Sequence, residues 1–182
     1  MDGGPLHKRV DVVIEAASDG RALVRVRVLR YAMDGKEQGD DDKRKLEAQL
    51  LDGQSKGGFA VPFDEAHTGE YAYAVSGSTV AFTSLRRDAN HGDGTFVVDA
   101  AGHVTTMTYV PNVYPRFVSS GSVTDERAEV MPGFWASTRS DAEFGGRYLF
   151  IKGRASVVTE MSGYRRYPTR AAAEAAVEAA TL

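Results

Sequence analysis

The sequence predicts a mainly β protein: a curved antiparallel sheet or incomplete β-barrel with a C-terminal helix. Residues 94–109, GTFVVDAAGHVTTMTY, are typical of two strands joined by a tight turn that ends at Gly102. Glycine adopts positive φ at little cost, as a short hairpin connection requires. Residues 21–31 alternate between valines on one face and arginines on the other, which indicates a half-buried strand with a solvated arginine face.

The remaining elements follow from turn residues and β-branched runs. Pro62 restricts the apolar run at 59–63 to a sheet edge or a strand end. Residues 43–51 fit either a short helix or a strand. The alanine-rich segment near 169–181 predicts a closing helix with Thr169 as its N-cap. Further strands are expected at residues 10–17, 71–75, 79–85, 119–130, 147–152 and 154–161.

Length and composition limit the possible classes. The 182 residues predict one mainly β domain over 1–182, with an exposed, mobile polar loop near 33–45. A net charge of -3 argues against general nucleic-acid binding. The absence of cysteine excludes disulfides and thiolate chemistry. No run reaches the ~20 apolar residues of a membrane span, and MDGGPLHKRV at the N-terminus contains no apolar signal-peptide core.

The histidines and acids provide the best candidate for chemistry. The most suggestive set is His91, Asp93, Asp99 and His103, which contains residue types that bind zinc or transfer protons. A strand rising ~3.3 Å per residue separates His91 from the turn by roughly 20 Å, so the four cannot surround one ion. The acids at 40–42 lack the rest of a calcium loop. The sequence therefore predicts no metal and no cofactor.

Enzyme motifs are absent from the sequence. No G-x-S-x-G elbow or Walker motif occurs, and the acids Asp64, Glu65 and Glu70 around His67 indicate a solvated loop. We therefore expect no catalytic residues.

Large apolar side chains gather in the second half of the chain. On the concave face of a curved sheet they would line a pocket for an apolar ligand. If a helix or loop fills the concavity, the same residues form a plain core. The candidate ligand-binding residues are Phe96, Met107, Tyr109, Trp135, Tyr148 and Phe150.

The order of parts between residues 70 and 168 is defined by several short segments. They are YAYAV at 71–75, VAFTSLRRD at 80–88, GTFVVDAAGHV at 94–104, GRYLFIK at 146–152 and YRRY at 164–167. This order resembles that of bacterial envelope proteins related to the lipoprotein carriers of the outer-membrane sorting pathway. The resemblance implies a curved, incomplete barrel with an apolar concave side, a periplasmic or other envelope location, and no catalysis.

Three functional hypotheses follow. The first is a non-enzymatic envelope domain that binds a lipid, an acyl chain or a lipidated protein on the concave face. The second is a protein-interaction or structural domain without a pocket, which pairs through strand edges or the arginine face at 21–30. The third is a hydrolase. An open apolar hollow favours the first and a filled core the second, whereas a histidine bonded to a carboxylate inside a cleft favours the third.

Overall fold

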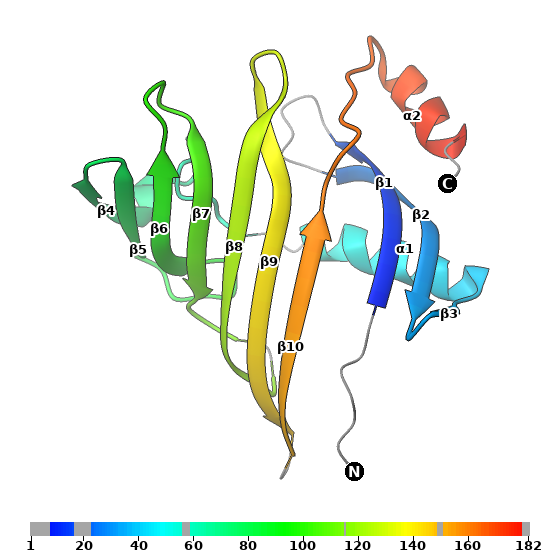
Figure 1. The fold of residues 1–182 in the computed structure, drawn as a ribbon, viewed down its shortest axis with the longest axis horizontal. Helices are drawn as coiled ribbons and strands as arrows, with labels where there is room; N and C mark the ends of the chain where they lie inside the picture. The colour runs from blue at the N-terminus through cyan, green and yellow to red at the C-terminus, as the bar shows by residue number, and fades with distance from the viewer. Residues whose placement is uncertain (1–7, 17–22, 56–58, 115, 149–150, 180–182) are drawn as a thin grey trace. The chain divides into compact units, whose positions relative to one another are not determined.

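The computed structural model describes residues 8–16, 23–55, 59–114, 116–148 and 151–179, and the fold is mainly β, as predicted (Figure 1). The chain divides into two compact units, and the single domain expected over 1–182 stays a prediction. One unit comprises Met1–Gly58 and Arg166–Leu182, and the other comprises Phe59–Arg165.

The Phe59–Arg165 unit is built on an open antiparallel sheet of seven strands. Each strand pairs with its neighbours in sequence, so β4 and β10 form the two edges (Figure 1). A short 3-10 helix, η1 (Thr68–Glu70), precedes the first strand. The strands are β4 (Tyr71–Ser76), β5 (Thr79–Ser84), β6 (Gly92–Val98), β7 (Val104–Pro111), β8 (Val118–Met131), β9 (Phe134–Tyr148) and β10 (Ile151–Glu160).

The predicted hairpin is confirmed. β6 and β7 pair across the turn at Asp99, and Gly102 has a φ of 93°. The prediction for the last strands is wrong in detail, because β9 occupies residues expected to be irregular and β10 runs through Gly153 without a break. Serine, glycine and charged residues lower the local strand signal over 118–148, but pairing on both sides supplies the strand structure there.

The core of this unit lies on one face of β4 to β7. Phe82 is 1% exposed and packs between Tyr71 and Phe96. The chain before β4 covers these rings. Phe59 stacks on Tyr109 with a centroid distance of 3.7 Å, and Phe63 meets Phe96 edge-on at 5.5 Å. Residues 59–63 therefore form an irregular covering segment instead of the expected strand end.

The other unit contains a three-stranded sheet and two helices. β1 (Lys8–Ala16), β2 (Leu23–Met33) and β3 (Lys36–Glu37) pair in that order. Val26 and Val28 are buried, as their alternation predicts, and the Val28 amide donates to Glu47 in α1 (Asp40–Ser55) at 2.7 Å. On the opposite face Arg27 donates to the Val177 carbonyl in α2 (Arg170–Ala179) at 3.3 Å. The arginine face is therefore not simply solvated.

The helix α1 corrects the expected mobile loop near 33–45. β2 extends to Met33, β3 follows, and α1 begins at Asp40. The three acids of its first turn face the positive end of the helix dipole, and each pairs with a cation three residues on. The expected C-terminal helix is present, and Thr169 caps it by accepting from the Ala172 amide at 3.2 Å.

Replacing Phe82 by alanine should lower the free energy of unfolding by about 3–5 kcal/mol, because it leaves a cavity among the rings of the core. The exposed Leu85, at 67%, provides the control, and Leu85→Ala should change stability by no more than about 0.5 kcal/mol. Urea unfolding of both variants measures the difference. Equal effects would contradict the assignment of the core to this face.

Candidate functional site

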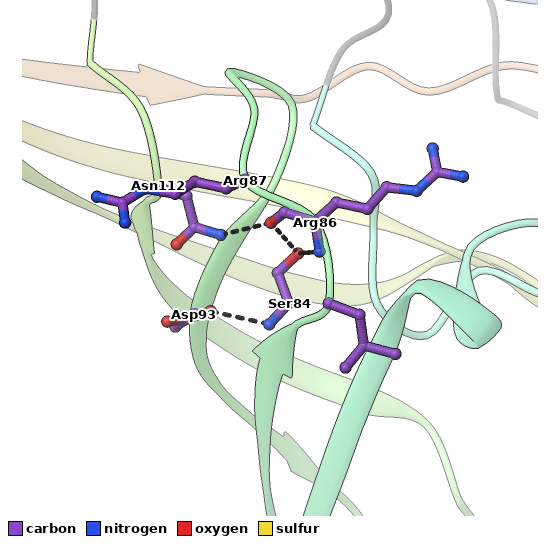
Figure 2. A pocket seen from close by; sticks show the side chains of 6 residues that line it. Ser84, Arg86, Arg87, Asp93 and Asn112 are labelled. Atoms are coloured by element: carbon purple, nitrogen blue, oxygen red, sulfur yellow. Dashed lines mark hydrogen bonds between the residues drawn. The ribbon is translucent and has the colours of Figure 1, made fainter.

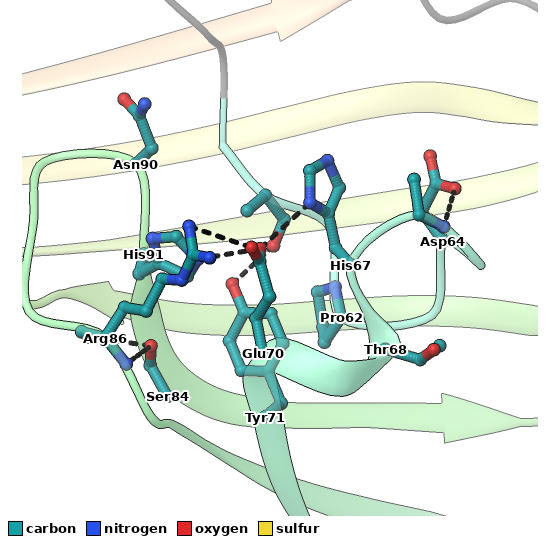
Figure 3. A network of polar contacts seen from close by, with 12 residues as sticks. Pro62, Asp64, His67, Thr68, Glu70, Tyr71, Ser84, Arg86, Asn90 and His91 are labelled. Carbon is teal, nitrogen blue, oxygen red and sulfur yellow. Dashed lines mark hydrogen bonds and ion pairs between the residues drawn. The ribbon is translucent and has the colours of Figure 1, made fainter.

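Glu70 is the centre of a polar cluster that comprises His67, Glu70, Arg86, Asp88 and His91, hereafter the Glu70 cluster. Figure 3 labels all of these residues except Asp88. Glu70 ends η1, and its carbonyl accepts from the Leu85 amide at 2.8 Å. This bond extends the β4–β5 hairpin by one pair and brings Arg86 next to Glu70. One carboxylate oxygen, Oε1, binds the Arg86 guanidinium at 2.9 Å, and Oε2 accepts from both histidines.

His91 is buried, with 3% of its surface exposed, and both of its ring nitrogens face carboxylates. Nδ1 lies 2.6 Å from Asp88 Oδ1, and Nε2 lies 3.0 Å from Glu70 Oε2. An ionised carboxylate only accepts hydrogen bonds, so both nitrogens must donate. The geometry therefore selects the doubly protonated imidazolium.

The pKa shifts agree with this ion triplet. Burial alone lowers the pKa of His91, but the hydrogen bonds to Asp88 and Glu70 outweigh it and raise the pKa overall. The hydrogen bond from His91 lowers the pKa of Glu70 against the opposing effect of burial. The same histidine and the Asn90 amide lower the pKa of Asp88. All three groups are therefore held in their charged forms.

This arrangement is suited to holding the chain together rather than to proton transfer. A general base needs an unoccupied nitrogen in reach of a substrate, and His91 has none. The cluster instead links η1 to the loop before β6. In the same loop, the Asn90 carbonyl accepts a hydrogen bond from the Ala60 amide at 2.8 Å. Polar contacts thus hold the covering segment and the sheet together.

A polar hollow of about 380 Å³ lies beside Arg86 (Figure 2). Asp93 accepts from the Ser84 amide at 2.8 Å, and the Asn112 amide group donates to the Arg86 carbonyl at 3.1 Å. The Ser84 hydroxyl is bonded to the backbone of Arg86. These bonds are internal to the strand ends, and His91 does not line the hollow. The residues that line the hollow therefore include no nucleophile–base pair, and the hollow does not support the third hypothesis, a hydrolase.

The four residues of the predicted His/Asp set do not meet. His91 belongs to the Glu70 cluster, and Asp93 binds the Ser84 amide. Asp99 accepts the amides of Ala101 and His103, which shapes the hairpin turn, and its side chain also lies 3.3 Å from His103 Nδ1, so this one pair of the set meets as expected. Within the described ranges, no three histidine or acidic side chains are arranged to hold a metal ion.

The predicted ligand-binding residues have different positions. Phe96 and Met107 are buried in the core, and Tyr109 lies beneath Phe59. Trp135 is half-buried on β9 and stacks on His103 at 4.4 Å. The side chain of Tyr148 and the whole of Phe150 lie outside the described residues.

Sequence reasoning did not find the Glu70 cluster. It placed His67 and Glu70 in a solvated loop and grouped His91 with residues of the hairpin. The available signal was the spacing His67-x-x-Glu70 and Asp88-x-x-His91, in which each histidine has a carboxylate three residues away. Only the fold of the β4–β5 hairpin joins the two pairs.

Comparison of the chain with known protein families, with curated proteins and with solved structures found no match. In the part of the chain that the structure describes, no helix is both long and apolar enough to cross a membrane.

The Glu70 cluster should give stability a bell-shaped dependence on pH. The contribution of His91, whose pKa is raised, is present below the ordinary histidine pKa and is lost as pH rises through the raised value. The contributions of Glu70 and Asp88 are present above ordinary carboxylate pKa values and are lost as pH falls through the lowered ones. The cluster should stabilise most between roughly pH 5 and 6.5.

Thermal melts across pH measure this dependence, with His91→Gln as the test variant and His103→Gln, which removes a more exposed histidine–carboxylate pair with Asp99, as the control. The His91 variant should melt lower, and most of the loss should fall inside that window. If His91→Gln lowered the melting temperature by the same amount at every pH, that result would refute the charged triplet.

Proposed function

We propose that the Phe59–Arg165 unit is a non-enzymatic interaction domain that pairs with a second copy of itself through the edge strand β4. The observation that carries this proposal is the unprotected backbone of β4. The filled core supports it as well, because the covering segment occupies the apolar face at Phe96 and Met107. Lipid binding and an envelope location stay predictions from the sequence.

Alternate residues of β4 direct their backbone groups outward. The bond from the Leu85 amide to the Glu70 carbonyl fixes which positions pair with β5. Ala72, Ala74 and Ser76 bond to β5, so the N–H and C=O groups of Tyr73 and Val75 point away from the sheet. β4 has no neighbour on that side in the sheet order.

This edge lacks the features by which proteins normally block strand addition. Residues 71–85, YAYAVSGSTVAFTSL, contain no charge and no proline, and the β4–β5 register has no bulge. Val75 is 73% exposed. The opposite edge, β10, carries Lys152, Arg154 and Glu160. The contrast singles out β4 as the edge suited to pairing.

The sequence of β4 favours a second copy as the partner. YAYAV reads nearly the same in both directions, with large residues at odd positions and alanines at even ones. In an antiparallel pair centred on Tyr73, Tyr71 would face the partner's Val75, and Ala72 would face the partner's Ala74. Such a two-fold contact is self-complementary and sets no like charges against each other.

Val75→Pro tests this pairing, because it removes an outward N–H without breaking a bond to β5. The protein should show a concentration-dependent dimer in analytical ultracentrifugation, and the variant should stay monomeric with its melting temperature nearly unchanged. Val158→Pro removes an outward N–H on β10 and is the matched control, which should still dimerise. Val75→Lys offers a second test that keeps the backbone intact.

A wild-type chain that stays monomeric at every concentration would rule out pairing with a second copy. A Val75→Pro dimer as strong as the wild type would exclude β4 as the interface.

A further inference from the structure

Three cations share one face of the sheet near the end where β9 ends and β10 begins, and Figure 1 shows this end of the sheet. Arg147 on β9 is directly opposite Lys152 on β10, and Arg154 is opposite Gly145, two pairs further along. Directly opposite residues, and residues two apart on one strand, share a face of an antiparallel sheet. Like charges at such positions repel each other, and for Lys152 and Arg154, two residues apart on β10, a bound anion would relieve that repulsion.

The cations surround a hollow of about 500 Å³ that Ser119 and Ser120 on β8 also line. No carboxylate lines the hollow, and no ion pair joins Lys152 or Arg154 to an acid among the described residues. On β9 the next acid on this face is Glu143, two residues from Gly145 and opposite Ser122. The volume is in the range of small-molecule sites, at roughly 300–1,000 Å³.

Gly145 keeps the floor of this hollow open. It lies between Ser120 and Arg154 in the sheet register. A Cβ at this position would be 2.7 Å from the Ser120 hydroxyl oxygen. Any larger residue would therefore displace Ser120 or fill the space between the serine and the arginine.

We propose that this hollow binds a phosphate group. Arginine and lysine donate charge-assisted hydrogen bonds to phosphate oxygens, and serine hydroxyls add neutral donors. A doubly charged phosphate would neutralise both Lys152 and Arg154, which a single carboxylate would not do. The site is at the opposite edge of the sheet from β4, so it is independent of the proposed pairing.

The phosphate could belong to a soluble compound or to a lipid headgroup. Phe117 distinguishes the two sources. Its carbonyl accepts from the Arg147 amide at 2.9 Å, its ring is 49% exposed, and it has a φ of 74°. The guanidinium of Arg116 lies 4.9 Å from the ring centroid. An exposed aromatic ring beside cations contributes to binding at a membrane surface but not to binding a small soluble anion.

The test is calorimetric titration with inorganic pyrophosphate, together with sedimentation on phosphatidylcholine vesicles with and without phosphatidylglycerol. The wild type should bind pyrophosphate saturably. The double variant Lys152→Gln/Arg154→Gln should bind about tenfold more weakly or worse, because two charge-assisted contacts are lost. Gly145→Ala should weaken binding with no change in charge. Arg165→Gln/Arg166→Gln, at exposed positions outside the hollow, matches the charge change and should bind normally.

Phe117→Ala identifies the source of the phosphate. Loss of binding to the anionic vesicles with unchanged pyrophosphate affinity points to a lipid headgroup, whereas wild-type protein that binds pyrophosphate but no vesicles points to a soluble compound. Absence of saturable pyrophosphate binding in the wild type would overturn the proposal. Equal weakening in the two double variants would overturn it too, since that result reflects net charge alone.

Discussion

The apolar face of β4 to β7 must be buried, and in this unit the chain just before the first strand covers it. Residues 59–63 place Phe59 on Tyr109 and Phe63 against Phe96, and so remove from water the rings that would otherwise form an apolar concavity. The rest of the unit depends on this contact. It converts the candidate ligand-binding residues Phe96 and Met107 into core, and it sets the position from which η1 and β4 begin.

An irregular covering segment cannot hold itself in place with a ladder of strand hydrogen bonds, and polar contacts at its ends take over that task. The hydroxyl of Tyr71 donates to the Ala60 carbonyl, and the Ala60 amide donates to Asn90. The Glu70 cluster joins η1, which follows the covering segment in the chain, to the same loop. A buried charged histidine is costly unless both nitrogens are satisfied, and here two carboxylates satisfy them. The most enzyme-like group of side chains is thus explained by the need to fasten the covering segment to the sheet.

The sequence was sufficient to predict an element where its local residue preferences agree with what the folded structure requires at that position. The β6–β7 hairpin needed a positive φ at Gly102, and the alternating valines of β2 needed a core on one side, so both could be predicted. It was insufficient where long-range pairing overrides local preference. Charged residues and glycines in β9 concealed a long strand, and the acid-rich run at 40–42 concealed a helix start. The Glu70 cluster depends on residues 21 positions apart, and these meet only after β4 and β5 have paired.

The charges of the sheet are distributed unevenly from edge to edge, and this distribution links the two proposals. β4 is neutral and β10 carries cations, although the same unbroken antiparallel ladder joins them. Pairing through β4 would join two seven-stranded sheets and leave a cationic hollow at each far edge. Two such sites on one rigid sheet would bind a surface carrying many phosphates more tightly than either site alone, because the second contact becomes intramolecular. A single soluble phosphate would gain nothing from the pairing. Phosphate affinity that rises with dimerisation on vesicles, but not in solution, is therefore the behaviour expected if both features serve one function.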